Sequence, residues 1–154
     1  FNDPQKTRSV KRGDLFTAGD YGYLDEEGWL YLCDRRSDLI LSGGVNIYPA
    51  EIEAVLMQHP SVSDAVVVGL PDPEWGQSVC ALVQPREPAP SHALEALRAE
   101  LTAYCGQHLA SFKRPRHLLL AHVPRTDAGK VGRAAVRQAL LAGELRPLAG
   151  AAPA

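Results

Sequence analysis

Two apolar, β-rich runs lie in the middle of the chain, at residues 65–68 and 79–83. Both are rich in valine, and β-branched side chains pack well on the surface of a pleated sheet. Pro71 and Pro73 separate the runs and Pro85 follows the second, so each is expected to end as a short strand. The pattern predicts two strands that pair across the proline-bounded loop, and neither is long enough to cross a bilayer.

Helical periodicity appears on both sides of this pair. Residues 49–58 are predicted to form a helix, because Pro49 is tolerated in a first turn and apolar residues recur at i, i+3 and i+4 from Ile52. Immediately before it, residues 39–41 read as a short strand that runs into a glycine turn at 42–44.

The second half of the chain continues the alternation. A helix is predicted from a cap at Ser91 to a stop at Gly106, a third strand over 117–123, and a last helix over 132–141. No internal repeat is present. The order of elements predicts an α+β fold with a small three-stranded sheet packed with helices.

The amino-terminal part has a different character. Residues 21–33 alternate around an Asp-Glu-Glu-Gly turn and predict a β-hairpin, and the charged stretch 34–38 is the candidate domain boundary. We therefore expect one segment at 1–36, a domain at 37–143, and a disordered tail of alanine and proline over 144–154. The chain opens on phenylalanine rather than methionine, which suggests a piece of a longer protein.

Composition limits the possible functions. Hydrophobic residues make up 45% of the chain and charged residues 22%, as in an ordinary globular protein. The net charge of −2 and a pI of about 6.2 imply no general attraction to nucleic acid or to an anionic membrane. No signal peptide or membrane-spanning segment is apparent, so a cytoplasmic location is expected. The three cysteines and five histidines lack metal-ligand spacing, so no metal site is predicted.

A lysine beside a glycine is the most suggestive chemical feature. Residues 124–133 form a polar loop that presents Lys130, next to Gly129, just before the predicted last helix. Lysine supplies a compact positive charge suited to phosphate or carboxylate oxygens. The loop is not a P-loop, because the required first glycine falls on Pro124 and the residue after the lysine is Val131. From composition alone, a solvated surface lysine is the more common explanation.

Three weaker features also suggest contact with a nucleotide. The adjacent glycines Gly43 and Gly44 permit close passage of a thin ligand or another backbone, although a tight turn explains them equally well. Asp20 lies in a turn and could accept hydrogen bonds from sugar hydroxyls, or simply form the turn. A further cluster combines cations with an aromatic ring and could bind a phosphate and stack on a base, or form a solvated basic connection: Phe112, Arg114 and Arg116.

Three motifs occur in a fixed order. The first is Thr-Ala-Gly-Asp at 17–20 with Gly-Trp-Leu-Tyr at 28–31. The second is Asp-Arg-Arg-Ser-Asp-Leu-Ile at 34–40, continuing through Ser-Gly-Gly-Val-Asn-Ile-Tyr-Pro-Ala-Glu-Ile-Glu at 42–53. The third is Pro-Arg-Thr at 124–126 with Gly-Lys-Val at 129–131. Together they resemble the adenylate-forming superfamily, in the branch of acyl-CoA synthetases and long-chain fatty-acid–CoA ligases. The resemblance extends over nearly the whole chain and assigns residues 37–143 to the mobile carboxy-terminal lid domain.

The resemblance implies an ATP-dependent ligase of fatty acid metabolism or of aromatic acids. Such enzymes use Mg-ATP to convert a carboxylic acid to an acyl-adenylate and pyrophosphate, and CoA then displaces AMP. Asp20 and Arg35 are implied to hold the ribose hydroxyls of ATP or AMP. Lys130 is implied to stabilise charge on the transferring α-phosphoryl group and the carboxylate.

The same resemblance implies a hinge at Arg36 and Ser37, about which the lid rotates between the half-reactions. Gly43 and Gly44 would then line the channel for the pantetheine arm of CoA, and the Phe112 cluster would hold the CoA nucleotide. Two positions depart from the family pattern: Ala18 is inserted in the first motif, and Ser37 stands where Asp or Lys is more frequent.

The phosphate loop and acyl pocket of this family belong to an amino-terminal large domain, which would be the partner of this chain, so the chain alone is expected to be inactive. The alternatives are a stand-alone nucleotide-binding or interaction module that keeps the lid fold without catalysis, and an adenylation domain with an acceptor other than CoA.

Overall fold

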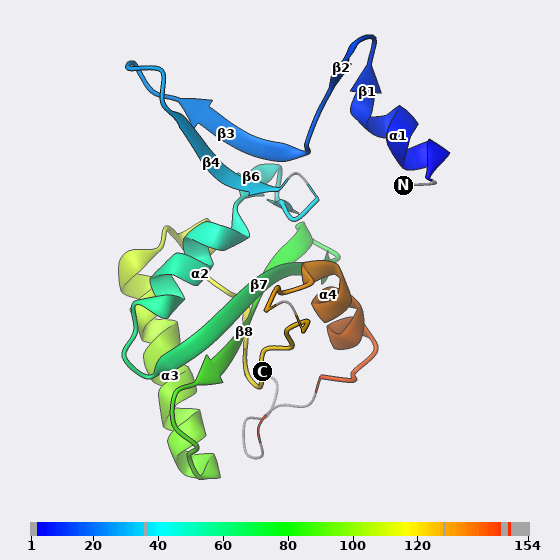
Figure 1. Ribbon diagram of the computed structural model, residues 1–154. Coiled ribbons are helices and arrows are strands. Elements are labelled where there is room, and N and C mark those ends of the chain that lie inside the picture. Colours follow the sequence, from blue (N-terminus) through cyan, green and yellow to red (C-terminus); the bar gives the residue numbers. More distant parts are fainter. Residues whose placement is uncertain (1–2, 36, 128, 146–147, 149–154) are drawn as a thin grey trace. The chain divides into compact units, whose positions relative to one another are not determined.

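The computed structural model describes residues 3–35, 37–127, 129–145 and 148. The chain forms two compact units that divide between Ser37 and Asp38, here called the first unit and the second unit. Each unit is described by itself (Figure 1).

The first unit consists of one short helix and two hairpins. Strands β1 and β2 pair antiparallel, as do β3 and β4. The elements are α1 (Pro4–Val10), β1 (Lys11–Arg12), β2 (Leu15–Phe16), β3 (Asp20–Leu24) and β4 (Leu30–Arg35).

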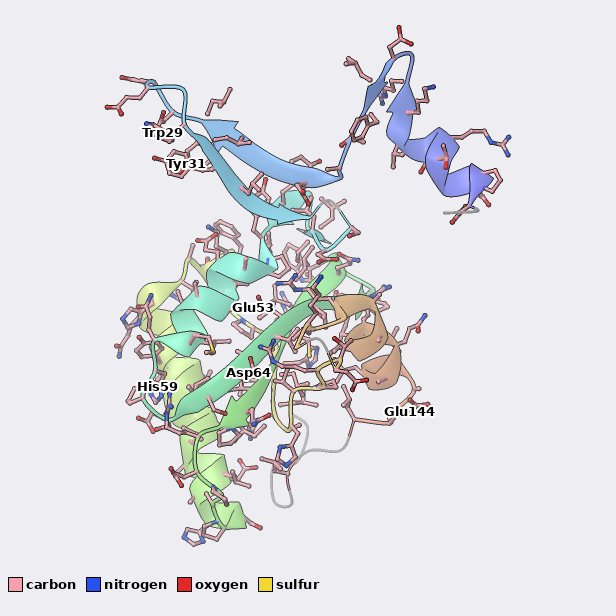
Figure 2. The ribbon with its side chains drawn as sticks, in the orientation of Figure 1. Trp29, Tyr31, Glu53, His59, Asp64 and Glu144 are labelled. Carbon is pink, nitrogen blue, oxygen red and sulfur yellow. The ribbon has the colours of Figure 1, made fainter. Side chains whose placement is uncertain are left out.

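The β3–β4 hairpin confirms the one predicted over residues 21–33. Asp25 closes its turn, because the carboxylate oxygen Oδ1 accepts the amide hydrogens of Glu27 at 3.0 Å and Trp29 at 2.9 Å. The bond from the Trp29 amide is the main cause that lowers the pKa of Asp25. Tyr23 and Tyr31 face each other across the strands and stack with ring centroids 5.0 Å apart. Figure 2 labels Trp29 and Tyr31 on this hairpin.

The second unit contains a short hairpin, a three-stranded sheet and three α-helices. Its elements are β5 (Ile40–Ser42), β6 (Val45–Ile47), α2 (Pro49–Met57), β7 (Val62–Asp72), β8 (Gly76–Pro85), α3 (Ser91–His108), the 3-10 turn η1 (Ser111–Lys113), β9 (His117–Leu120) and α4 (Arg133–Leu141).

The sheet has the order β7-β8-β9. Strand β8 runs antiparallel to β7, with Val67 opposite Ala81, and parallel to β9, with Cys80 opposite His117. The two valine-rich runs therefore form the paired strands that the sequence predicts. The α+β fold with a small three-stranded sheet is confirmed.

Both faces of β7 and β8 are buried, and successive residues divide between two apolar clusters. On one face, Val67, Ala81 and Val83 pack with Ile52 and Leu56 of α2 and with Leu94 and Leu101 of α3. On the other face, Val66, Cys80 and Leu82 pack with Val136 of α4. Figure 1 shows α2 and α3 on one side of these strands and α4 on the other. Burial on both faces explains why the strands read as continuous apolar runs rather than as alternating ones.

Several local predictions were wrong in detail. Helix α3 continues through Gly106 to His108, and Pro90 rather than Ser91 precedes its first turn. Strand β9 ends at Leu120, although Ala121 and Val123 remain buried beyond it. The short elements β1, β2, β6 and η1 were not predicted, because two or three residues carry no measurable periodicity. The seven-residue helix α1 was not predicted either.

The tail prediction falls largely on residues that the structure does not describe, 146–147 and 149–154. Leu145 lies against the α4 cluster, and the Leu148 amide donates to the Leu120 carbonyl oxygen at 2.8 Å. The Glu144 amide also donates to the Ala139 carbonyl oxygen at 2.9 Å. The disordered tail stays a prediction for residues 146–147 and 149–154, which lie outside the described residues.

Candidate functional site

The loop between β9 and α4 exposes Lys130 at the surface of the second unit. Thr126 closes the loop: its amide donates to the Lys130 carbonyl oxygen at 2.9 Å, and its hydroxyl accepts the Lys130 amide hydrogen at 3.2 Å. Gly129 adopts a φ of 72°, which favours glycine. Lys130 is exposed, and among the described residues its ammonium makes no ion pair. The loop therefore offers a cation to solvent.

The helix that follows the loop is fastened by Arg133, its first residue. The Arg133 guanidinium donates to Glu53 of α2 at 2.6 and 3.2 Å and to Asp38 at 2.9 Å. Glu53 also accepts the Val67 amide of β7 at 2.8 Å. These side chains are about four-fifths buried, so this network links the first residue of the second unit to α2, β7 and α4.

Asp20 and Arg35, the predicted ribose ligands, belong to the first unit. They are opposite each other in the β3–β4 register. Residues directly opposite in an antiparallel pair have Cβ atoms about 5 Å apart. The backbone thus brings the two predicted ligands together, although the Arg35 side chain is not described. Of the predicted hinge, Ser37 is exposed and ends the first unit, and Arg36 lies outside the described residues.

The glycine turn joins β5 to β6 and packs against a tryptophan. Gly43 has a φ of 57°, and a Cβ atom there would lie 2.7 Å from the Trp75 ring. The Gly43 amide donates to the Trp75 carbonyl oxygen at 2.9 Å. Gly44 has a φ of 80° and faces open space. Only a glycine at position 43 allows this turn to approach the β7–β8 loop so closely.

Trp75 is held in place by Asp72, the last residue of β7. The carboxylate oxygen of Asp72 accepts the amide hydrogens of Glu74 and Trp75, both at 2.9 Å. The bond from the Trp75 amide is the main cause that lowers the pKa of Asp72. These two hydrogen bonds fix the backbone of the turn that carries the Trp75 ring.

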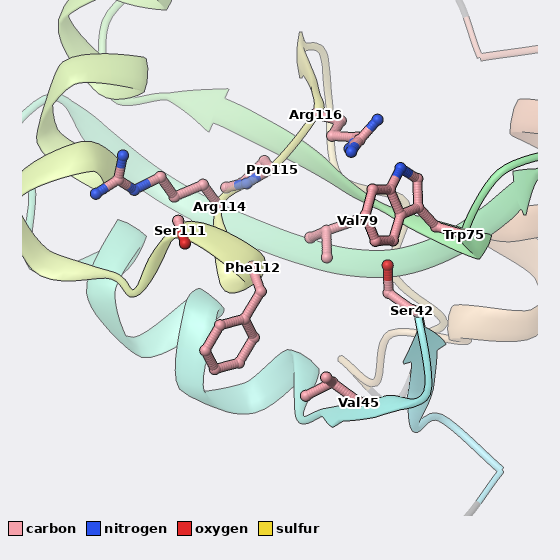
Figure 3. Close-up of a pocket in the computed structure, with 10 residues that line it drawn as sticks. Ser42, Val45, Trp75, Val79, Ser111, Phe112, Arg114, Pro115 and Arg116 are labelled. Carbon is pink, nitrogen blue, oxygen red and sulfur yellow. The ribbon is translucent and has the colours of Figure 1, made fainter.

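A pocket of about 420 Å³ lies between the glycine turn and η1 (Figure 3). Its lining includes Gly43, Phe112, Arg114 and Arg116 from the predicted CoA-binding residues, together with Trp75. The Arg116 guanidinium lies 5.2 Å from the centre of the Trp75 ring. The pocket thus combines two exposed aromatic faces with a cation, a combination suited to a planar, negatively charged ligand.

Arg114 has a different function in the fold. Its guanidinium donates to the carbonyl oxygens of Gly106 at 2.8 Å and Leu109 at 3.1 Å, near the end of α3. A helix leaves its last carbonyls without partners, and a cation there is favourable. Figure 3 shows the Arg114 head group pointing away from Trp75. The CoA-binding role of Arg114 therefore stays a prediction, beside this contact with the end of α3.

Sequence reasoning missed Trp75. A large aromatic side chain in a loop of prolines and acids is an unusual choice, and it was the available signal. Its partner Gly43 is distant in sequence, so only the fold shows that the two meet.

The two cysteines whose side chains the structure describes, Cys80 and Cys105, are buried. Burial raises the pKa of Cys80 to about 12 and also raises the pKa of Cys105. In the part of the chain that the structure describes, no group of three His, Cys, Asp or Glu side chains is placed to hold a metal ion. None of the described helices is both long and apolar enough to span a bilayer.

Comparison with known protein families identifies the domain. A family model for the carboxy-terminal domain of AMP-binding enzymes matches residues 51–130, just over half of the chain. The chain belongs to this family. The match ends at Lys130, so it covers the AMP-binding-enzyme domain from α2 to the exposed lysine.

The curated relatives of this AMP-binding-enzyme domain are acyl-CoA ligases. A 2-succinylbenzoate–CoA ligase from Geobacillus is 45% identical over 136 residues, which are 88% of this chain and 27% of that protein. A long-chain-fatty-acid–CoA ligase from Mycobacterium tuberculosis is 39% identical over 139 residues, 90% of this chain and 26% of that protein. The chain thus spans about a quarter of the length of the relatives it matches.

Solved structures agree with this assignment. An o-succinylbenzoate CoA synthetase from Bacillus subtilis, in complex with its acyl-adenylate intermediate, superposes with a TM-score of 0.75 at 40% identity, over 89% of this chain and 27% of that one. A fatty acyl CoA synthetase from Mycobacterium tuberculosis gives 0.68 at 38% identity, over 91% of this chain and 27% of that one.

Proposed function

We propose that the chain is the carboxy-terminal part of an ATP-dependent, AMP-forming acyl-CoA ligase. The observation that carries the proposal is Lys130, a solvent-exposed cation on a closed loop at the end of a family domain whose relatives are acyl-CoA ligases. The remainder of the active site, including the acyl pocket, would come from a large domain of the same enzyme.

In the first half-reaction, a carboxylate oxygen of the acid attacks the α-phosphorus of Mg-ATP, and pyrophosphate leaves with the electrons of the broken P–O bond. Lys130 would place its ammonium beside the oxygens where negative charge accumulates, which is electrostatic stabilisation rather than covalent catalysis. Asp20 accepts hydrogen bonds from the ribose hydroxyls in this proposal, and Arg35 opposite it in the hairpin fixes the same sugar.

In the second half-reaction, the CoA sulfur attacks the acyl carbon of the adenylate and AMP leaves. The two half-reactions need different charges at one centre, so the proposal includes a rotation about Arg36 and Ser37 that withdraws Lys130. The 420 Å³ pocket would then hold the CoA nucleotide, with its adenine between Trp75 and Phe112 and a phosphate on Arg116. Gly44 would line the path of the pantetheine arm.

The acid substrate is proposed to be fatty or aromatic, because the relatives act on 2-succinylbenzoate and on long-chain fatty acids. The metal in the reaction enters with ATP as part of the substrate. A cytoplasmic location is proposed because ATP and CoA are both supplied there.

The direct test is pyrophosphate exchange by the full-length ligase with a panel of carboxylic acids that includes 2-succinylbenzoate and a long-chain fatty acid. Exchange that depends on one acid, followed by formation of its CoA thioester, is the expected result. Exchange with no acid in the panel and no thioester product would contradict the ligase proposal.

Lys130→Ala in the same enzyme should slow adenylation by about 100- to 1,000-fold, the effect of removing one donor from a developing charge. Thioester formation from supplied acyl-adenylate should change less than about threefold. Equal loss in both half-reactions would show that the lysine serves the fold or a shared step instead.

Gly44→Leu should slow the second half-reaction rather than the first, the opposite of Lys130→Ala. A side chain at this position would obstruct the proposed pantetheine path, so the CoA step should slow while pyrophosphate exchange is retained. An unchanged CoA step would remove Gly44 from the channel.

A further inference from the structure

The part of the loop next to Lys130 is joined to the sheet by the Arg125 guanidinium. Arg125 Nε donates to Asp64 Oδ2 at 2.6 Å, and Arg125 Nη2 donates to Asp64 Oδ1 at 2.7 Å. The remaining nitrogen, Nη1, donates to the carbonyl oxygen of Gly129 at 2.6 Å. One planar group therefore joins β7 to the residue directly before the lysine.

The anchor on the sheet is itself rigid. Asp64 lies on β7 (Figure 2), its side chain is 15% exposed, and its Oδ1 also accepts the Ala65 amide hydrogen at 2.9 Å. A bidentate arginine–carboxylate pair fixes direction as well as distance. The bond to Asp64 is also the main cause that raises the pKa of Arg125.

The loop transmits this anchorage to Lys130. Gly129 donates its amide to the Thr126 carbonyl oxygen at 2.7 Å, and Thr126 exchanges two hydrogen bonds with the Lys130 backbone. Fixing the Gly129 carbonyl therefore fixes the plane of the peptide that leads into Lys130. Asp64 neutralises Arg125, so the loop presents one unpaired cation instead of two among the described residues.

We infer that Arg125 and Asp64 are positioning residues for Lys130, and that they support adenylation by holding the Gly129 carbonyl. This inference rests on the proposed ligase function. Neither side chain is assigned a contact with the substrate, so their influence would pass through the placement of the lysine.

The test measures both half-reactions of the full-length ligase for Arg125→Ala, Asp64→Asn and Lys130→Ala, and for each of the first two combined with Lys130→Ala. Arg125→Ala should slow adenylation by about tenfold or more, because a displacement of about 1 Å can cost up to 100-fold. Asp64→Asn should slow it by a smaller factor, and the thioester step should change in neither. In the Lys130→Ala background, neither substitution should lower adenylation further.

Arg137→Ala is the matched control. Arg137 of α4 also donates to the β7 backbone, at the Gly69 carbonyl oxygen and 2.8 Å, and among the described residues it forms no hydrogen bond with the lysine loop. It should leave the ratio of the two half-reaction rates unchanged. A further variant exchanges the pair, Asp64→Arg with Arg125→Asp. It restores the ion pair but removes the donor to the Gly129 carbonyl from position 125, so adenylation should remain slow.

The outcomes separate the two proposals. Loss of adenylation in Lys130→Ala, with Arg125→Ala and Asp64→Asn unaffected, overturns the positioning role and leaves the ligase function standing. Additive losses in the Lys130→Ala background, or full recovery in the exchanged pair, also overturn it. Unimpaired adenylation in Lys130→Ala overturns both. If Arg125→Ala does not fold by circular dichroism, the milder Asp64→Asn variant decides.

Discussion

The two units of the chain differ in how far their apolar side chains are buried. In the second unit, β7 and β8 are buried on both faces, and Val67, Leu82 and Val83 have no more than 1% of their surface exposed. In the first unit, no residue whose side chain is described is buried, and Trp29 and Leu30 are more than 60% exposed. The second unit has a buried apolar core of its own. The described side chains of the first unit, which contains a short helix and two hairpins, form no such core.

This difference indicates where the stability of the chain resides. Burial of apolar surface is the main favourable term in folding, and an isolated two-stranded hairpin is at best marginally stable in water. The second unit is therefore expected to supply nearly all of the free energy of unfolding. The exposed hairpin fits a segment that packs on the large domain of the proposed ligase.

The strongest way to break this comparison is to make the same substitution in both units. Leu82→Ala should lower the free energy of unfolding by about 2–5 kcal/mol, because it leaves a cavity between the sheet and α4. Leu30→Ala removes an exposed side chain and should change the free energy of unfolding by less than about 0.5 kcal/mol. Urea denaturation followed by circular dichroism measures both. Similar losses would mean that the first unit holds structure as firmly as the second.

A glycine pair sharpens the comparison. Gly28 in the first unit and Gly43 in the second both have positive φ, but an added Cβ at Gly28 would meet nothing within 4 Å. Gly43→Ala should lower the stability of the second unit by about 1–2 kcal/mol from backbone conformation alone, with a further loss from contact with Trp75. Gly28→Ala should leave the stability of the second unit unchanged.

The fluorescence of Trp75 tests the contact with Gly43. It is measured in a Trp29→Phe background, in which Trp75 is the remaining tryptophan. Gly43→Ala should shift the emission, because the added methyl group displaces the ring. Unshifted emission together with wild-type stability would show that the turn and the ring do not touch in solution.

The sequence alone predicted much of the second unit. Local sequence was enough to predict the strands at 65–68 and 79–83 and the helix at 49–58, because strand and helix periodicities depend on near neighbours. The exposed lysine loop was also predictable, since polar residues and a glycine lie just before a helix. Boundaries were less certain: α3 passes through Gly106, because packing of Leu101 and Cys105 outweighs the glycine penalty.

Contacts between distant residues could not be predicted. Arg125 and Asp64 are separated by 61 positions, and nothing in either local sequence indicates that they form a pair. The same holds for Gly43 with Trp75. The bonds of Arg114 were equally hidden in the sequence, because its guanidinium donates to the Gly106 and Leu109 carbonyl oxygens near the end of α3.

Alkaline pH provides a probe of the second unit alone. Burial raises the pKa of Cys80 from 9.0 to about 12, so the folded state retains a proton that the unfolded state releases. The stabilisation is complete below pH 9 and is lost as the pH rises towards 12. Wild type should therefore lose about 1.4 kcal/mol per pH unit relative to Cys80→Val between pH 9.5 and 10.5. Parallel pH profiles for the two proteins would show that the thiol is not protected.

Removal of residues 1–37 should have the smallest effect of all. If the apolar clusters of the second unit are complete, the truncated chain should unfold with a free energy within about 0.5 kcal/mol of the intact chain. Trp75 is then the sole tryptophan, so its emission in urea follows that unit directly. The denaturant slope should also stay the same, because the slope follows the surface exposed on unfolding and the hairpin hides little. A truncated chain that loses several kcal/mol would mean that the first unit shields apolar surface of the second, and the two would then have to be treated as one cooperative structure.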